Sequence, residues 1–355
     1  MKKLFLIINK ILILLVLLLA VAHSSIIVLK KIKKENLYYV LLNDYQKNNY
    51  AHLKPSQVSD LLESTWYRNW EYLPILGFKE GTVVSSFVNV NDFGVRSNDG
   101  VQVTYNDLNN SVWFFGGSTT FGYGVEDNNT IPSKFERKSN EKVINFGAGF
   151  YYSFQENHLF KKFLKSHKPK YAIFLDGHNE SCSINPYQDE MSILFRESQS
   201  TYNWSLKKIF EPILFYTNKI NQQRNSNQRI QSNPWDEQLK DCNFNGTQIP
   251  LTKIVDNNLK ERARICKLNN IKCYTFLQPF PRIHVPHLDK SRLTDEAAKS
   301  MKLLYDKLEP IFKINDGITL ENLNFDSNKH YYIDSSHYSK EASKIIANRI
   351  FQYID

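Results

Sequence analysis

The chain has 355 residues, enough for one large domain or two modest ones, and 42% of them are hydrophobic, which supports a real core. Its formal charge of +9 is concentrated at one end. The first 34 residues hold seven lysines and no acidic residue, so the rest of the chain carries 38 basic and 36 acidic residues. Because nucleic-acid binding calls for a basic patch within the folded domain, nucleic acid is excluded as an expected partner.

Residues 11–29 form an apolar span whose only polar members are His23, Ser24 and Ser25. This is about the length a helix needs to cross a bilayer. We therefore predict that residues 1–35 form an N-terminal transmembrane helix with basic flanks, which makes the lipid bilayer a partner. A cleaved signal peptide, giving a secreted form, is the alternative, because residues 20–22 resemble a cleavage site.

Residues 36–110 are expected to form an N-terminal extension that packs on the core. From residue 111 onward, apolar runs alternate with helical patterns. Strands are predicted near 111–116, 142–146, 170–176 and 271–277, and helices near 131–139, 152–166, 251–269, 291–313 and 338–353. This alternation predicts a parallel sheet with helices on both faces. Residues 181–250 are rich in aromatic residues and asparagine, and we interpret them as a helical insertion near the active site.

The first core strand ends in Gly116-Gly117-Ser118. Such a turn can hold a hydroxyl at the end of a strand with backbone N–H groups around it, which is the geometry an activated serine needs. By itself a glycine-rich turn is more often only a turn. A phosphate cradle is less favoured, because no Gly-Lys-Ser/Thr follows.

Three further segments accompany this turn. They are Val143-Ile144-Asn145-Phe146-Gly147-Ala148-Gly149, Gly177-His178-Asn179-Glu180 after a third strand, and Asp334-Ser335-Ser336-His337 before the last helix. In order and spacing, the four segments resemble the four blocks of the SGNH (GDSL-type) hydrolase family, in its membrane-anchored bacterial type. The resemblance covers residues 111–180 and 325–353. It implies a three-layer α/β/α, flavodoxin-like sandwich with a central parallel sheet, and a hydrolase domain at 111–355.

The resemblance also assigns roles to single residues. Ser118 is the expected nucleophile, His337 its base and Asp334 the carboxylate that orients the imidazole. The backbone N–H groups of Ser118 and Gly147 and the side-chain amide of Asn179 are the expected oxyanion donors. Gly117 and Glu180 stand where the family has aspartates, and neither change removes one of these groups. No cofactor or metal is implied.

Two expectations concern the surroundings. Segments like Gly94-Val95-Arg96 precede the first block in anchored relatives, so we interpret this one as a strand and turn supporting the site, with Arg96 structural. Anchored relatives usually act outside the cytoplasm, so we expect the catalytic domain in the periplasm or at the cell surface. The lysine count around the apolar span does not favour that orientation.

Alternatives remain for several residues. His330, with Asp326 before it, competes with His337 as the base, and Asp334 could instead cap the last helix, a role Ser335 or Ser336 could also fill. His284 and His287, with Asp289 nearby, lack the helical spacing of a zinc motif, and the loop that carries them could line the substrate site. Four cysteines, 182, 242, 266 and 273, permit two disulfides without requiring them, and Cys273 could be a buried apolar residue.

The sequence therefore predicts a serine esterase acting on short acyl esters such as the O-acetyl groups of cell-surface glycans. An O-acyltransferase that passes acetyl to a polysaccharide hydroxyl would use the same residues. A non-catalytic glycan-binding or assembly protein on the same fold is the third interpretation, which the intact serine, histidine and carboxylate disfavour.

Overall fold

The structure is a computed structural model. It describes residues 42–66, 70–74, 76–177, 179–180, 239, 241–244, 246–284, 294–321, 323–326 and 329–355, with 10, 12–14, 17–18, 21, 23–24 and 39. Within these ranges, no helix combines the length and apolar character needed to span a membrane. Most of the span predicted at 11–29 lies outside the described residues.

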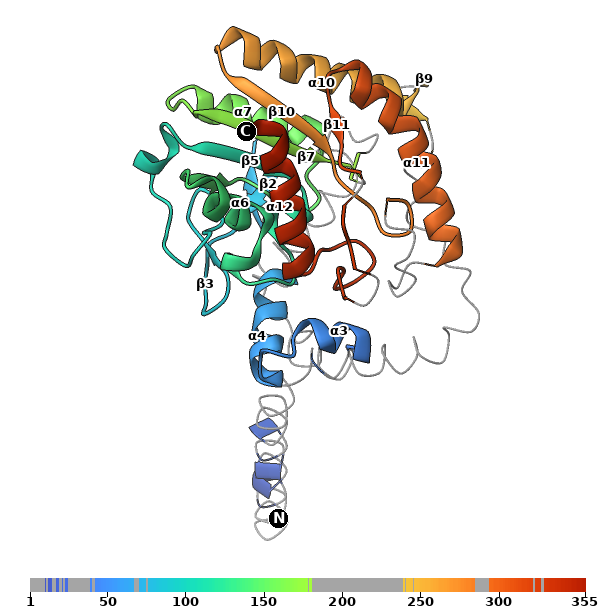
Figure 1. Ribbon diagram of the computed structural model, residues 1–355. Helices are drawn as coiled ribbons and strands as arrows, with labels where there is room; N and C mark the ends of the chain where they lie inside the picture. Colours follow the sequence, from blue (N-terminus) through green and yellow to red (C-terminus); the bar gives the residue numbers. More distant parts are fainter. Residues whose placement is uncertain are drawn as a thin grey trace.

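A five-stranded parallel sheet forms the centre of the molecule (Figure 1). From edge to edge its strands are β11 (Ile318–Thr319), β10 (Lys272–Leu277), β7 (Tyr171–Asp176), β5 (Val112–Gly116) and β6 (Val143–Asn145). In chain order this is the doubly wound arrangement 2-1-3-4-5 of flavodoxin-like folds. The predicted flavodoxin-like parallel sheet is thus confirmed, with the short β11 added at its edge.

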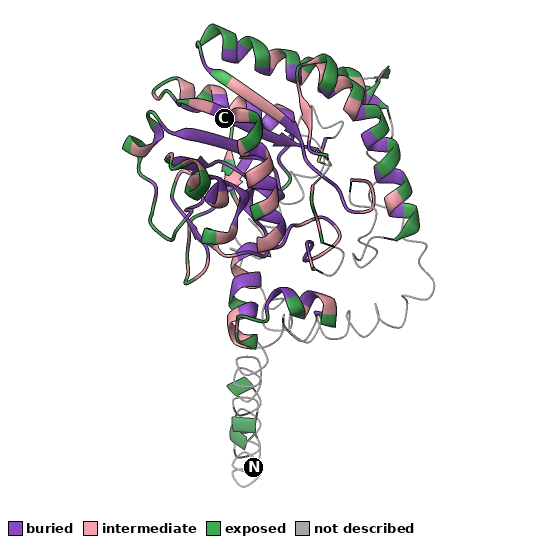
Figure 2. Cartoon of the chain, viewed as in Figure 1, coloured by how far each residue is buried: buried purple, intermediate pink, exposed green. Residues whose placement is uncertain are grey.

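Helices cover both faces of the sheet. This explains why the sequence of β5 is apolar throughout. Val112 and Phe114 pack in the cluster that includes α6 (Ile131–Ser139) and α12 (Lys340–Ile354). Trp113 and Phe115 pack in the opposite cluster, which includes α7 (Ser153–Leu164) and α10 (Leu251–Leu268). A strand buried on both faces needs apolar side chains at every position, and Figure 2 shows β5 buried along its length. α11 (Asp295–Ile314) packs beside α10.

The N-terminal extension shares the core of the sheet. It contains α3 (Asp44–Asn49), α4 (Pro55–Trp66), the hairpin β1 (Trp70–Leu73) and β2 (Gly77–Glu80), the pair β3 (Val83–Val84) and β4 (Asn89–Val90), and a 3-10 turn at Tyr105–Leu108. Phe78 and Val95 belong to the same apolar cluster as Trp113. The backbone N–H of Arg96 donates to the carbonyl of Asn145 at 3.1 Å, which joins the extension to the end of β6.

The prediction of a helical insertion at 181–250 is wrong in part. Its last residues form an antiparallel hairpin, β8 (Cys242–Phe244) and β9 (Thr247–Ile249), because a Gly246 with positive φ makes a tight turn between two short extended segments. Residues 181–238, which include the rest of the insertion, lie outside the described residues.

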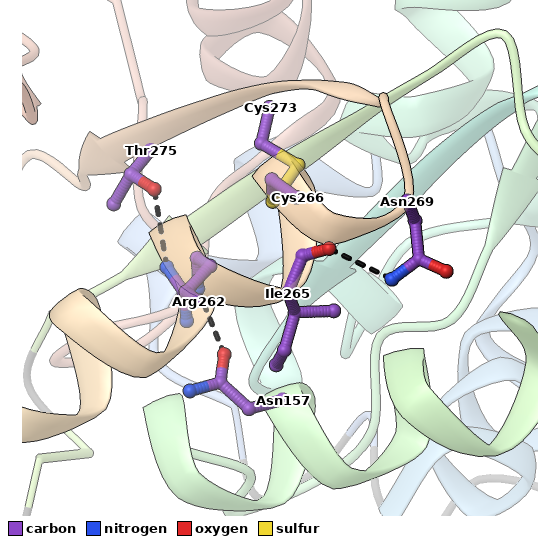
Figure 3. The surroundings of a disulfide bond; sticks show 7 residues. All are labelled: Asn157, Arg262, Ile265, Cys266, Asn269, Cys273 and Thr275. Atoms are coloured by element: carbon purple, nitrogen blue, oxygen red, sulfur yellow. Dashed lines mark hydrogen bonds between the residues drawn. A yellow bond between two sulfur atoms is a disulfide. The ribbon is translucent and has the colours of Figure 1, made fainter.

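A disulfide joins Cys266, near the end of α10, to Cys273, in β10 (Figure 3). The interpretation of Cys273 as merely a small apolar residue is therefore wrong. Cys242 is disulfide-bonded as well. The bridge fixes the turn by which the chain leaves α10 and enters the sheet.

Replacing both Cys266 and Cys273 by serine is expected to lower the free energy of unfolding by about 2 kcal/mol, because the bond closes a short loop in the unfolded chain. Urea denaturation without reductant, followed by circular dichroism, measures the change. Equal unfolding free energies for the variant and the parent protein would contradict the prediction.

Candidate active site

The structure brings together the three residues expected to form a catalytic relay. Ser118 Oγ lies 2.9 Å from His337 Nε2, and His337 Nδ1 lies 2.6 Å from Asp334 Oδ2. Ser118 begins the short helix α5 (Ser118–Phe121) directly after β5, whereas the other two residues precede α12. Both loops lie at the carboxyl edge of the sheet. Ser118 and Asn179 follow β5 and β7, neighbouring strands that flank the point where the strand order reverses, which is where such sheets bind ligands.

The turn that carries Ser118 admits glycine alone at two positions. A Cβ on Gly116 would lie 2.1 Å from Thr120 Oγ1, and one on Gly117 would lie 2.3 Å from Asn179 Nδ2. Both distances are well below van der Waals contact. A side chain at position 117 would therefore require the Asn179 amide to shift.

Arg96 holds the other end of α5. Its buried guanidinium donates to the carbonyls of Phe121 and Gly122 at 2.7 and 2.6 Å, and its Nε donates to Asp127 at 3.0 Å. A cation is favourable at the carboxyl end of a helix, where carbonyls lack partners. This agrees with a structural role for Arg96.

Asp334 is arranged to orient His337 and not to cap the last helix. Its Oδ1 accepts the backbone N–H groups of Ser336 and His337 at 2.8 and 2.7 Å, while Ser339 caps α12. Burial acts to raise the pKa of Asp334, but the charge and hydrogen bonds of His337 outweigh it and hold that pKa at about 2. The carboxylate is therefore ionised at neutral pH. The ring of Tyr123 stacks on that of His337 at 5.2 Å, which further restricts the imidazole.

The competing histidines have other partners. His330 Nε2 lies 3.5 Å from Asn48 Nδ2, and its ring meets Tyr45 edge-on. His284 accepts the N–H of Phe280 and pairs with Glu309 at 3.1 Å, and burial lowers its pKa. His287 and Asp289 lie outside the described residues. Across the described ranges, no cluster of three or more His, Cys, Asp or Glu side chains suits a metal ion.

Two of the three expected oxyanion donors have an N–H group without a partner in the described part of the chain. Neither the Ser118 N–H nor the second N–H of the Asn179 amide has a partner among the described residues, and the first Asn179 N–H donates to the carbonyl of Tyr151 at 3.0 Å. Gly147 does not fit its expected role. Its N–H donates to Asn145 Oδ1 at 3.0 Å, and a Cβ there would lie 2.3 Å from the backbone nitrogen of Phe121. Gly147 instead allows the loop after β6 to pack against α5.

Phe150, which the sequence did not mark, carries a free amide in this loop. Its N–H has no partner within the described part of the chain, its φ is +61°, and its side chain is 64% exposed. Left-handed backbone costs a residue with a Cβ about 1–2 kcal/mol. The carbonyl of the next residue, Tyr151, accepts a hydrogen bond from Asn179, whose side chain lies against Gly117. The Phe150 N–H therefore belongs to the loop that contacts Asn179. No sequence signal identifies the position, because phenylalanine rarely adopts this conformation.

Buried charges lie beneath Asn179. Arg262 donates to both carboxylate oxygens of Asp176 and to Asn157 and Thr275, the last two shown in Figure 3. Glu180 accepts hydrogen bonds from Ser153. Burial, together with the charge of Asp176, nevertheless raises the pKa of Glu180 to about 7. Glu180, in place of the family's aspartate, thus supports the loop that follows β6.

Comparison with known proteins finds no matching family model and no matching curated protein. The similar solved structures include an acetyl xylan esterase (12% identity, 69% of this chain and 99% of that chain, TM-score 0.39). A psychrotrophic esterase from Pseudoalteromonas sp. has 12% identity, 69% and 97% coverage and a TM-score of 0.38. A member of the lipolytic G-D-S-L family from Veillonella parvula has 10% identity, 68% and 96% coverage and a TM-score of 0.35. These names agree with the resemblance found in the sequence.

The Asp334 pKa predicts how acid affects stability. Its folded value of about 2 lies below the unfolded value of about 3.9, so this group stabilises the fold above pH 4 and loses that contribution, about 2 kcal/mol, as the pH falls toward 2. We expect Asp334→Asn to show a smaller loss of unfolding free energy between pH 4.5 and 2 than the parent chain. Parallel pH dependence in the two proteins would contradict this.

Proposed function

We propose that this protein is a serine carboxylic ester hydrolase of the SGNH type that acts on short acyl esters. The observation that carries the proposal is the unbroken relay from Asp334 through His337 to Ser118, with contacts of 2.6 and 2.9 Å. A serine hydroxyl is a weak nucleophile unless a base within hydrogen-bond reach accepts its proton, and this arrangement supplies the base. Asp334, ionised at neutral pH, fixes the tautomer that leaves Nε2 free to act.

The reaction follows from these contacts. His337 Nε2 takes the Ser118 proton as Oγ attacks the ester carbonyl, and negative charge forms on the carbonyl oxygen. That oxygen accepts hydrogen bonds from the N–H groups of Ser118 and Phe150 and from the side-chain amide of Asn179. His337 then protonates the departing alcohol, which leaves an acyl group on Ser118. In the second half, water gives its proton to His337 as it attacks the acyl carbonyl. The bond to Ser118 Oγ then breaks, His337 returns the proton to that oxygen, and the acid leaves.

The substrate we propose is an O-acetyl ester on a cell-surface glycan. We also propose that residues 1–35 anchor the protein in the membrane, with the catalytic domain outside the cytoplasm. Disulfide bonds at Cys266–Cys273 and at Cys242 support this location, because such bonds persist in oxidising compartments and are rare in the cytoplasm. Surface glycans occur in the same compartment. The lipid bilayer is the second partner under this proposal.

A fluorophosphonate probe tests the nucleophile. We expect the parent chain to be labelled and Ser118→Ala to remain unlabelled, because only an activated serine reacts at a useful rate. His337→Ala should lower labelling and ester turnover by several orders of magnitude, since the base is lost. His330→Ala, a matched histidine replacement on the neighbouring loop, should change little. An unlabelled but well-folded parent chain would instead favour a binding protein.

Product analysis separates hydrolysis from transfer. With an acetylated oligosaccharide as donor, we expect free acetate in proportion to the ester consumed, even when an unacetylated glycan is added as acceptor. Chromatography with mass detection measures both products. Acetyl groups accumulating on the acceptor with little free acetate would identify an O-acyltransferase.

A further inference from the structure

The loop between β6 and α7 is held at both ends by buried carboxylates. On one side, the N–H of Gly149 donates to Glu80 Oε1 at 2.5 Å. On the other, the N–H and hydroxyl of Ser153 donate to the two oxygens of Glu180 at 3.0 and 2.7 Å. Glu80 is 0% exposed and Glu180 is 1% exposed. Phe150, with its unpaired N–H, lies between these two attachment points.

Burying a carboxylate is unfavourable unless hydrogen bonds compensate it. Here the compensating donors include the backbone N–H groups of Gly149 and Ser153, so each carboxylate helps to fix where the chain runs between these two residues. The left-handed conformation of Phe150 is itself unfavourable, and such a conformation persists only where the surroundings determine it. Two fixed points, one residue before Phe150 and three residues after it, meet that requirement.

The two carboxylates come from different parts of the chain. Glu180 directly follows Asn179, an expected oxyanion donor. Glu80 ends β2 of the N-terminal extension, outside the segment that resembles a hydrolase. The extension is also fastened to α7, which follows this loop, by Gln155 Nε2 donating to the carbonyl of Leu76 at 2.8 Å.

We propose that Glu80 is a positioning residue for the oxyanion site: together with Glu180 it holds the Phe150 amide where the developing oxyanion forms. The N-terminal extension is then part of the catalytic unit. The inference rests on the proposed esterase function. It requires that loss of the Glu80 hydrogen bond lower the rate of the chemical step more than it lowers substrate binding, because the Phe150 N–H interacts mainly with charge that appears in the transition state.

The test compares three variants on a small acetyl ester. Glu80→Leu removes the acceptor, Glu80→Gln keeps an oxygen in the same place, and Gln155→Leu breaks a similarly buried bond between extension and core without touching the loop. For Glu80→Leu we expect kcat to fall about 10²–10³-fold, the usual effect of losing one oxyanion donor, with KM within a few-fold of the parent value. Glu80→Gln should recover most of that loss. Gln155→Leu should lower the melting temperature and leave kcat unchanged.

The outcomes separate the inference from the function it rests on. If the parent chain neither hydrolyses the ester nor reacts with a fluorophosphonate, the proposed function fails. If the parent is active and Glu80→Leu keeps its kcat, or loses no more than Gln155→Leu does, the positioning role fails. Should Glu80→Leu not fold, Glu80→Asp replaces it. Its shorter side chain draws the carboxylate away from Gly149, and a reduced kcat at an unchanged melting temperature is expected, whereas an unchanged kcat would overturn the proposal.

Discussion

The hydrogen bond from Ser118 to His337 joins residues 219 positions apart, and the rest of the structure serves to keep those two side chains in contact. Neither loop could hold its place alone. The parallel sheet brings them to one edge, because strands running in the same direction end together. The apolar cluster on one face packs α12 against β5, with Phe114 and Ala342 in the same cluster, and Phe121 of α5 lies in a separate apolar cluster with Ile333. The contact between Ser118 and His337 thus depends on packing in a core that contains neither residue.

Ionisable side chains fix the path of the backbone around the site, as apolar packing fixes the elements of the core. Arg96 donates to the carbonyls at the end of α5, Glu80 and Glu180 accept from the loop after β6, and Asp334 accepts from its own loop. In each case an ionisable side chain meets main-chain groups that would otherwise lack partners. Apolar contacts could not set these positions as closely, because they are not directional. The cost of burying each charge is offset by hydrogen bonds that determine the path of the backbone.

Much of this arrangement could be predicted from sequence, because the responsible signals are local. Buried strands appear as apolar runs, as in Val112–Gly116, and the Asp334-Ser335-Ser336-His337 segment carries its own spacing. What escaped prediction depends on how segments pack against one another. Gly147 proved to be a packing residue because Phe121 lies against it, and Cys273 pairs with Cys266 across a turn whose geometry a sequence does not display. The Phe150 conformation is imposed by neighbours and opposed by its own preference.

The extension before residue 111 shows the same limit at a larger scale. The resemblance sets it apart from the hydrolase segment, yet it supplies Arg96 to α5 and Glu80 to the loop after β6. Without these two side chains, the carbonyls of Phe121 and Gly122 and the N–H of Gly149 would lose those partners in a buried environment, which is costly for each group. The boundary near residue 110 therefore separates stretches of sequence, while the hydrogen bonds that shape the candidate active site cross it.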